Sequence, residues 1–407
     1  MTGASAALAG VLHTLRPVHD ILDGRVEDVE PPAWCERRGW TGYLLALDDT
    51  TLRRCEEEGL GARAADLPGA PADLTALAAA VVAATRLPVL HVDLATPTEP
   101  ALRGVSARKR LQLPALLGAV GAMAERAGRI VDVGAGNGHF TRLAASHFDR
   151  EALGIERDPG RVAGAEARAA AVGSGARFLA VDACRETLAF APDDLAVGLH
   201  ACGELGDRLV LAAAAAGCDV ALVSCCLQKI EGPTRAPLSR AAAGFALRKD
   251  TLGLANLTAQ PLGVESSLVA TLAAREARFA LLRLLRERGV ELAPGEEMRG
   301  INRRRAHAGL AVIAAQALSL RGLPAAGEAE IARHALEAHR RYAQVRRLSL
   351  PRSMLARLVE LAVVLDRAAA LEESGHAVRV ATLFERAVTP RNIALFASRE
   401  GERLPGR

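Results

Sequence analysis

Three glycines alternate at positions 134, 136 and 138, directly after a run of β-branched residues. The run before them, 129–133, is typical of a short buried strand, and the residues after them carry apolar side chains at helical spacing. Glycine tolerates positive φ and lets a backbone approach a ligand closely, while the N-terminus of the following helix offers free N–H groups. The pattern therefore predicts a ligand-binding turn made of Asp132, Gly134, Ala135, Gly136 and Gly138.

The glycine spacing distinguishes this turn from a dinucleotide site. A dinucleotide fingerprint reads G-x-G-x-x-G, and its third glycine would fall on His139. The spacing G-x-G-x-G, with an acid just before it, resembles motif I of class I methyltransferases. That resemblance implies that the loop wraps the amino-acid end of S-adenosylmethionine. Taken without the rest of the chain, the turn is equally compatible with another Rossmann-like site or with a tight turn alone.

Two acids follow the next two predicted strands. Glu156 ends the strand at 152–156, about twenty residues after the loop, where an acid can accept from both hydroxyls of a ribose. Asp182 and Ala183 follow the strand at 177–181, at the point where methyltransferases bind adenine. The alternatives are a solvated strand end for Glu156 and a helix N-cap for Asp182. We expect the two carboxylates to hold the sugar and the base of the cofactor S-adenosylmethionine.

Sulfur and polar groups follow the next two predicted strands, 195–199 and 220–223, at the edge where open parallel sheets bind ligands. His200 is the candidate general base if the acceptor is a hydroxyl. The alternative is a histidine that only binds the cofactor or fills the pocket. Cys202 and Cys226 are candidate covalent nucleophiles, and buried pocket cysteines are the alternative.

Basic and polar residues are predicted to meet the substrate at the same edge: Arg108, Lys109, Lys229, Arg391 and Asn392. The first two precede a predicted helix at 114–127, whose start lies on the ligand side if helix and first strand run antiparallel. The last two occupy the turn between the two final strands, 378–384 and 393–398. The alternatives are a solvated basic turn and a purely structural turn.

The composition suits a globular α/β protein with an added domain. The chain has 407 residues, of which 50% are hydrophobic, and its net charge of +4 neither requires nor excludes nucleic acid. Its seven cysteines are too few and too irregularly spaced for a disulfide framework, and none forms a C-x-x-C pair, so we also expect no metal. No signal peptide and no apolar run of the ~20 residues that a membrane span needs is evident. We therefore predict a cytoplasmic protein without a membrane partner.

The predicted fold class is α/β, with a Rossmann-like sheet of six parallel strands and one antiparallel strand. Four regions are expected: an N-terminal mainly helical domain (1–105), a Rossmann-like core (106–230), a helical insertion between strands five and six (231–375), and a C-terminal β-hairpin (376–407). Trp34, Trp40 and Tyr43 indicate a small hydrophobic core in the first region, with a substrate-recognition surface as the alternative.

Basic clusters lie in the predicted insertion, at 303–305, 340–341 and 346–347. Such runs are usually solvated helix faces. The alternative is a nucleic-acid-binding role. Because arginine greatly outnumbers lysine throughout this alanine-rich chain, its arginine clusters carry less information than usual.

Four motifs occur in an order similar to that of a methyltransferase-like family: V-D-V-G-A-G-N-G-H-F, G-L-H-A-C-G-E-L, S-C-C-L-Q-K-I and T-P-R-N. The family includes the ribosomal RNA adenine dimethylase domain-containing protein and the glutathione-transferase C-terminal-domain-containing protein. The similarity covers residues 104–230 and 376–399, and R-K-R-L-Q resembles a further family element. It implies the class I methyltransferase fold.

Two narrower resemblances concern the histidine and cysteine motifs. They are similar to those of the tRNA 2′-O-methyltransferase acting on the acceptor stem, but Leu227 and Gln228 stand where that enzyme has histidines. RNA cytosine-5 methyltransferases also use cysteines near these two strand ends, but the proline and aspartate that neighbour those cysteines are missing here.

The expected function is an S-adenosylmethionine-dependent methyltransferase (EC class 2.1.1) that acts on RNA, either tRNA or rRNA. One alternative is a methyltransferase of a small molecule or a protein. The other is a nicotinamide-dependent enzyme or a non-catalytic nucleoside-binding protein. The sequence carries no signal of the oligomeric state.

Overall fold

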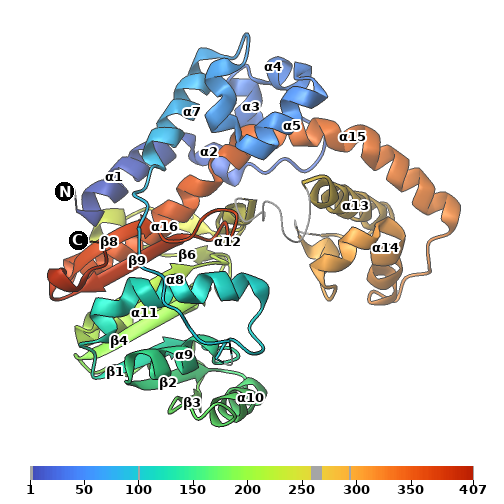
Figure 1. The fold of residues 1–407 in the computed structure, drawn as a ribbon. Helices are drawn as coiled ribbons and strands as arrows, with labels where there is room; N and C mark the ends of the chain where they lie inside the picture. Colours follow the sequence, from blue (N-terminus) through green and yellow to red (C-terminus); the bar gives the residue numbers. More distant parts are fainter. Residues whose placement is uncertain (1–2, 100, 258–267, 293–294, 407) are drawn as a thin grey trace. The chain divides into compact units, whose positions relative to one another are not determined.

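The computed structural model describes residues 3–99, 101–257, 268–292 and 295–406, and the chain divides into two compact units (Figure 1). The sheet unit comprises Met1–Val18, Ala83–Gln260 and Leu355–Arg407, and the helical unit comprises His19–Val82 and Pro261–Met354. These boundaries differ from the four predicted regions, because the first region and the insertion are each divided between the two units.

The sheet unit contains a seven-stranded sheet in the order β3-β2-β1-β4-β5-β9-β8. Its strands are β1 (Arg129–Val133), β2 (Glu151–Glu156), β3 (Arg177–Ala180), β4 (Asp194–Ala201), β5 (Asp219–Ser224), β8 (Ala377–Thr382) and β9 (Ile393–Ser398). The first five are paired in parallel, and β9 runs antiparallel to both β5 and β8. The predicted arrangement of six parallel strands and one antiparallel strand is therefore confirmed.

The strand order reverses at β1. The chain passes from β1 outward to β2 and β3, then returns to place β4 on the other side of β1. Such a switch point opens a crevice at the carboxyl ends of the strands, where α/β proteins bind ligands. The glycine turn follows β1 and therefore lies at this crevice.

Helices α8 (Ala107–Ala124) and α9 (His139–Phe148) share one apolar core with the sheet face that carries Ile130, Leu195 and Phe396. Helix α8 begins well before Pro114, where its start was predicted. The extended backbone of Ser106 ends the preceding loop, and the proline is accommodated inside the helix. A proline was thus mistaken for a helix start.

Helix α16 (Ala356–Glu373) packs against α1 (Ala4–Leu15), α11 (Glu204–Ala216) and strands β8 and β9 (Figure 1). Most of its side chains are buried, and the helix belongs to the sheet unit. Helix α10 (Pro159–Ala170) packs on β2 and β3.

Smaller elements complete the sheet unit. They are β6 (Thr234–Arg235), β7 (Leu247–Arg248), α12 (Lys249–Leu254), and the 3-10 turns η1 (Arg16–Val18), η3 (Arg240–Ala242), η4 (Ala255–Leu257) and η7 (Gly401–Arg403). The paired strands β6 and β7 show that the region predicted as a helical insertion also contains a small antiparallel sheet.

The helical unit is built from two separate stretches of chain. Its elements are α2 (His19–Asp23), α3 (Ala33–Arg37), α4 (Thr41–Ala46), α5 (Asp49–Glu58), α6 (Leu60–Arg63), η2 (Ala64–Asp66), α7 (Ala72–Ala84), α13 (Leu268–Glu287), η5 (Glu296–Met298), η6 (Arg303–Ala308), α14 (Leu310–Ser319) and α15 (Glu328–Met354). The helical periodicity of the sequence predicts a helix at 266–288, and its first two residues lie outside the described residues. Trp34 and Trp40 are buried and meet edge to face, with ring centroids 6.3 Å apart, which confirms the hydrophobic-core interpretation.

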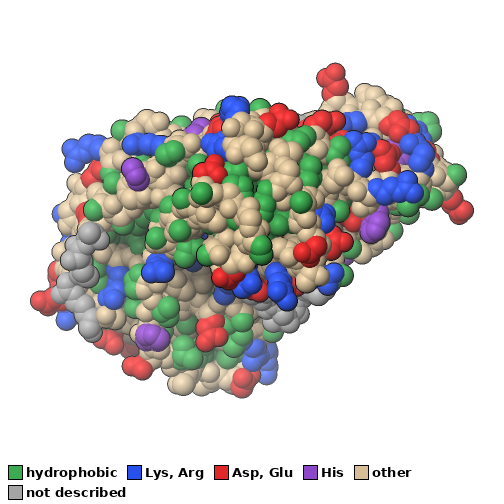
Figure 2. Space-filling model, turned by 90° about the horizontal axis from the view of Figure 1, so that it is seen from above, with side chains coloured by type: hydrophobic (Ala, Val, Ile, Leu, Met, Phe, Trp, Pro, Cys, Tyr) green, Lys and Arg blue, Asp and Glu red, His purple; other side chains and the backbone are tan. Residues whose placement is uncertain are grey.

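Several arginines of the helical unit form ion pairs within that unit. Arg346 pairs with Glu56, and Arg347 donates to Asp49 at 2.7 Å. Figure 2 shows basic and acidic side chains interspersed on the face that it draws. These contacts match the interpretation of the 346–347 cluster as an ordinary charged helix face. In the part of the chain that the structure describes, no helix has the length and apolar character that crossing a membrane requires.

Candidate functional site

The glycine turn is held against the end of β2. Gly134, Gly136 and Gly138 all have positive φ, at +80°, +60° and +70°. The N–H groups of Gly134 and Ala135 both donate to the Ile155 carbonyl, at 2.8 and 3.0 Å. A side chain at position 138 would meet the Phe178 ring at 2.5 Å. The turn therefore needs glycine both for its dihedral angles and for its close packing.

Glu156 faces this turn. Its Oε2 accepts a hydrogen bond from the Gly136 N–H at 3.0 Å, and its Oε1 accepts one from the Asp158 N–H at 3.2 Å. The residue is buried. Because each carboxylate oxygen has two lone pairs, both oxygens retain the capacity to accept a further bond from a ligand hydroxyl.

Asp182 lies beside the same strand end. Ala180 is paired with Glu156, and the Val181 N–H donates to the Glu156 carbonyl at 3.0 Å. The Asp182 carboxylate accepts from the Cys184 N–H at 3.0 Å. That bond lies in a turn, and no helix begins at Asp182, so the helix N-cap of the alternative interpretation is not observed. Because a carboxylate can accept several bonds, a role in adenine binding remains compatible with it and stays a prediction.

Asp132 anchors the helix behind the turn. Its Oδ2 accepts from the Thr141 hydroxyl at 2.7 Å, which ties β1 to α9. Burial raises the pKa of Asp132 to about 6, against the opposing effects of the Thr141 bond and the nearby Lys109. In this position the side chain supports the turn from within. Ala135 and Ala183, the two alanines among the predicted cofactor-binding residues, are also buried.

His200 occupies the end of β4 in an unusual conformation. Its φ is +66°, and the pairing with β5 shifts register between Leu199 and Ala201. Positive φ in a non-glycine residue is uncommon and is often found at functional sites. Burial lowers the pKa of His200 to about 4, and the positive charges of Arg108 and Lys109 act in the same direction. The imidazole is therefore neutral at pH 7.

The first turns of α8 lie against this histidine. Nε2 of His200 is 3.2 Å from Oε1 of Gln112, which is completely buried. The start of α8 thus lies at the ligand edge of the sheet, as its antiparallel orientation to β1 led us to expect. Arg108 is exposed and Lys109 is half-buried, and the binding of substrate by either residue remains a prediction.

Arg391 and Asn392 are buried in the turn before β9. Their polar atoms form hydrogen bonds with other groups of the protein. The Arg391 guanidinium donates to Asn256 at 2.8 Å and to Glu360 at 3.3 Å. Asn392 donates to the Phe384 carbonyl at 3.0 Å. These contacts match the structural alternative. Arg391 also contributes a positive charge near His200.

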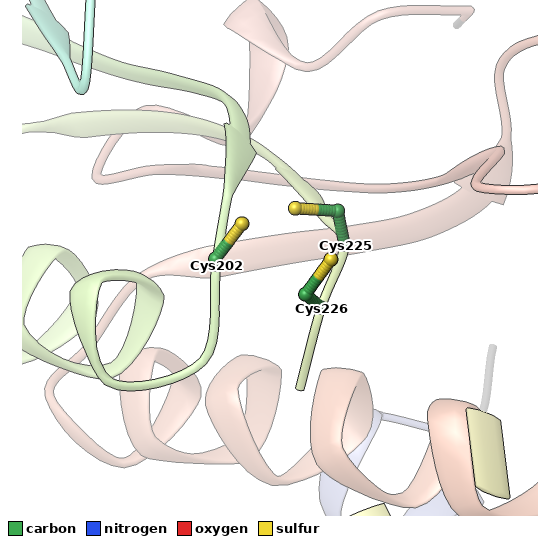
Figure 3. Close-up of side chains that lie close together, drawn as sticks. All are labelled: Cys202, Cys225 and Cys226. Carbon is green, nitrogen blue, oxygen red and sulfur yellow. The ribbon is translucent and has the colours of Figure 1, made fainter. Parts of the chain in front are cut away.

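Three cysteines come together at the ends of β4 and β5 (Figure 3). The sulfur atoms of Cys202, Cys225 and Cys226 lie within 4.8 Å of one another. The thiols of Cys225 and Cys202 both donate to the His200 carbonyl, at 3.0 and 3.3 Å. Hydrogen bonding to the other two thiols lowers the pKa of Cys226 and raises that of Cys225. Cys225 was not among the predicted site residues.

A close backbone contact joins the loops that carry these cysteines. The Glu204 N–H donates to the Lys229 carbonyl at 3.0 Å. Gly203, with φ of +47°, faces the same carbonyl, and a Cβ at this position would lie 2.1 Å from that oxygen. The Lys229 side chain is exposed beside this contact. Only glycine permits the two loops to approach this closely.

A buried ionic network supports both loops from behind. Arg367 of α16 is completely buried and donates to the Gly203 carbonyl at 2.6 Å, to the Ser224 hydroxyl at 2.6 Å and to Asp207 at 2.8 Å. Arg235 in turn donates to Asp207 at 2.9 Å and to Asp366 at 2.8 Å. Sequence reasoning missed this network, because its members are far apart in the chain and no local spacing connects them.

Comparison with known proteins gives one family match. The family described as a methyltransferase domain matches residues 110–233, from the second turn of α8 to the loop after Lys229. No curated protein matches the chain. The match covers the glycine turn, Glu156, Asp182 and all three clustered cysteines.

Solved structures show partial similarity. TrmN from Thermus thermophilus is 30% identical over 30% of this chain and 40% of that chain, with a TM-score of 0.24. A TehB-like SAM-dependent methyltransferase from Corynebacterium glutamicum is 18% identical over 30% and 65% of the respective chains, also with a TM-score of 0.24. CalS10, an amino pentose methyltransferase from Micromonospora echinaspora, is 26% identical over 33% and 59%, at the same TM-score.

This chain spans between 40% and 65% of the length of those three proteins, so their activities are not transferred to it. The narrower group to which the four motifs are similar is not distinguished by these matches and stays a prediction. The observed sheet order confirms the predicted Rossmann-like sheet. The family match supports a methyltransferase domain at residues 110–233, with S-adenosylmethionine as its cofactor.

Proposed function

We propose that the sheet unit transfers a methyl group from S-adenosylmethionine bound at the carboxyl ends of β1, β2 and β3. The observation that carries this proposal is the contact between the Glu156 carboxylate and the Gly136 N–H. It brings a hydroxyl-binding acid and a backbone that permits close ligand approach to one edge of the sheet. In a nucleoside that carries an amino-acid chain, the ribose hydroxyls would bind the acid and the amino-acid chain would lie against the glycine turn.

Methyl transfer needs mainly the correct placement of its two reactants. The acceptor's lone pair attacks the methyl carbon as the bond to the sulfonium breaks, and S-adenosylhomocysteine leaves. Since His200 is neutral at pH 7, it can accept a hydrogen bond or a proton from the acceptor. Of the three predicted catalytic residues, the cysteines Cys202 and Cys226 lie beside it at the same strand ends.

We further propose that the acceptor is RNA, either tRNA or rRNA. The resemblance of the histidine and cysteine motifs to those of RNA methyltransferases supports this choice, as do basic side chains at the same edge of the sheet. Arg108 and Lys229 are exposed, and Lys109 is close enough to influence His200. Such residues could neutralise phosphates around an acceptor nucleotide.

Two measurements test the proposal. Calorimetry with S-adenosylmethionine and with NADH should give binding of the first ligand alone. Tritium from methyl-labelled S-adenosylmethionine should then appear in the RNA fraction of a cell extract. Label in the protein or small-molecule fraction would overturn the RNA acceptor while keeping the enzyme class. Tight cofactor binding with no label in any fraction would overturn methyl transfer.

A further inference from the structure

The three clustered thiols have the geometry of a metal-binding site. Tetrahedral zinc binds thiolates at about 2.3 Å, which separates neighbouring sulfur ligands by roughly 3.8 Å. The sulfur atoms of Cys202, Cys225 and Cys226 already lie within 4.8 Å of one another. Figure 3 shows that they come from two neighbouring loops and converge on one place. Shifts of about an ångström would therefore suffice to bind one ion.

The backbone holds these thiols in place before any ligand arrives. Gly203 directly follows Cys202 and packs against the Lys229 carbonyl. Arg367 donates both to the Gly203 carbonyl and to Ser224, which directly precedes Cys225. Each side of the cluster is thus fixed by a residue adjacent in sequence to a cysteine. Supported ligands of this kind are what an effective metal site requires.

The local charge also suits a thiolate-rich site. Three thiolates and one divalent ion carry a net charge of −1, which a buried site must offset. Lys229 and Arg391 both lie close enough to Cys226 to act on it electrostatically. In the part of the chain that the structure describes, these cysteines are the one group of three or more histidine, cysteine or carboxylate ligands with such spacing.

We propose that Cys202, Cys225 and Cys226 together bind one Zn²⁺ ion through their thiolates and leave its fourth coordination position open. Soft thiolate ligands favour zinc over magnesium or calcium, and three protein ligands with one open position are typical of zinc sites that bind a further ligand. The thiol protons are released to solvent as the metal binds.

This proposal departs from the expectation that the chain binds no metal. That expectation is based on the absence of a C-x-x-C pair, which is a pattern of two ligands on one short segment of the chain. Here Cys202 follows β4 and the other two cysteines follow β5, and the parallel pairing of these strands brings them together. The proposal does not depend on the proposed methyl transfer, because metal binding is measured without S-adenosylmethionine.

The test uses the full chain, kept reduced, stripped of metal and then dialysed against Zn²⁺. We expect one zinc per chain by elemental mass spectrometry. Substituting Co²⁺ should produce thiolate-to-metal charge-transfer absorption, which needs no mutation to interpret. Absence of bound zinc, or cobalt binding without that absorption, would overturn the proposal.

Variants locate the ion. Cys202→Ser and Cys226→Ser should each weaken zinc binding at least tenfold. Cys184→Ser is the matched control, since Cys184 lies in the same unit but outside the cluster, and it should bind zinc like the wild type. Unchanged zinc affinity in either cluster variant would contradict the assignment. Circular dichroism of each variant confirms that the fold is retained.

Discussion

The N–H of Gly136 donates to the carboxylate of Glu156 at 3.0 Å, so a turn after one strand and an acid at the end of the next are in direct contact. Gly136 has a φ of +60° and no side chain to separate the two groups. The contact aligns the acid before a ligand binds. Several consequences can be measured.

Replacing Glu156 with glutamine should weaken S-adenosylmethionine binding by roughly tenfold to a hundredfold, because hydrogen bonds to a charged acceptor contribute about 1.5–3 kcal/mol. The amide has a single acceptor oxygen and no charge to offer two ribose hydroxyls. Calorimetric titration gives the affinity. Glu151→Gln, at the exposed opposite end of β2, is the control and should bind like the wild type. Equal affinities in both variants would remove Glu156 from the site.

Replacing Gly203 with alanine should destabilise the sheet unit, because the new Cβ would lie 2.1 Å from the Lys229 carbonyl oxygen. Gly173→Ala is a matched control, since Gly173 also has positive φ but open space around it. The control should cost about 1–2 kcal/mol of backbone strain, and Gly203→Ala at least about 2 kcal/mol more. Urea unfolding measures both. Similar losses in the two variants would mean that the loops separate without cost.

Replacing Arg367 with methionine should lower the free energy of unfolding by about 3–5 kcal/mol, since it leaves two buried carboxylates with Arg235 as their remaining cationic partner. The guanidinium is completely buried and donates to Asp207 at 2.8 Å. Arg240→Ala is the control, because Arg240 pairs with Glu373 at the surface and should change the stability by less than about 0.5 kcal/mol. A loss below about 1 kcal/mol in Arg367→Met would show that the network adds little.

Replacing Asp132 with asparagine should change how stability depends on pH. Burial raises the pKa of Asp132 from 3.8 to about 6. Between those values the folded state holds a proton that the unfolded state has lost, so wild-type stability falls as pH rises through this window. The variant lacks that loss and should gain up to about 3 kcal/mol relative to wild type above pH 6. Thermal unfolding of both proteins from pH 4 to pH 7 measures the difference, which would be constant if Asp132 did not titrate there.

The sequence was most informative about the sheet. Short runs of β-branched residues marked the strands, and β9 was predicted with the bounds observed, Ile393–Ser398. The position of Glu156 opposite the turn also followed from the pattern, because parallel strands end at one edge. These features depend on local periodicity, which a sequence displays directly.

Contacts between distant segments could not be predicted in the same way. The three thiols meet because β4 and β5 are neighbours in the sheet. A search for C-x-x-C pairs does not detect cysteines that come from two different strands. In the sequence, Arg367 looks like any other arginine of the predicted helical insertion, but the fold buries it beside Asp207 and Arg235. Pro114 misled the prediction of α8, because a proline inside a helix and one at its start look alike in sequence.

The place of β9 in the sheet has a consequence for synthesis on the ribosome. Strand β5 is complete at Ser224, but its partner β9 begins only at Ile393. The second stretch of the helical unit emerges between them. During that interval the β5 edge of the nascent chain is apolar and unpaired. Such an edge can pair with the wrong strand or bind a chaperone.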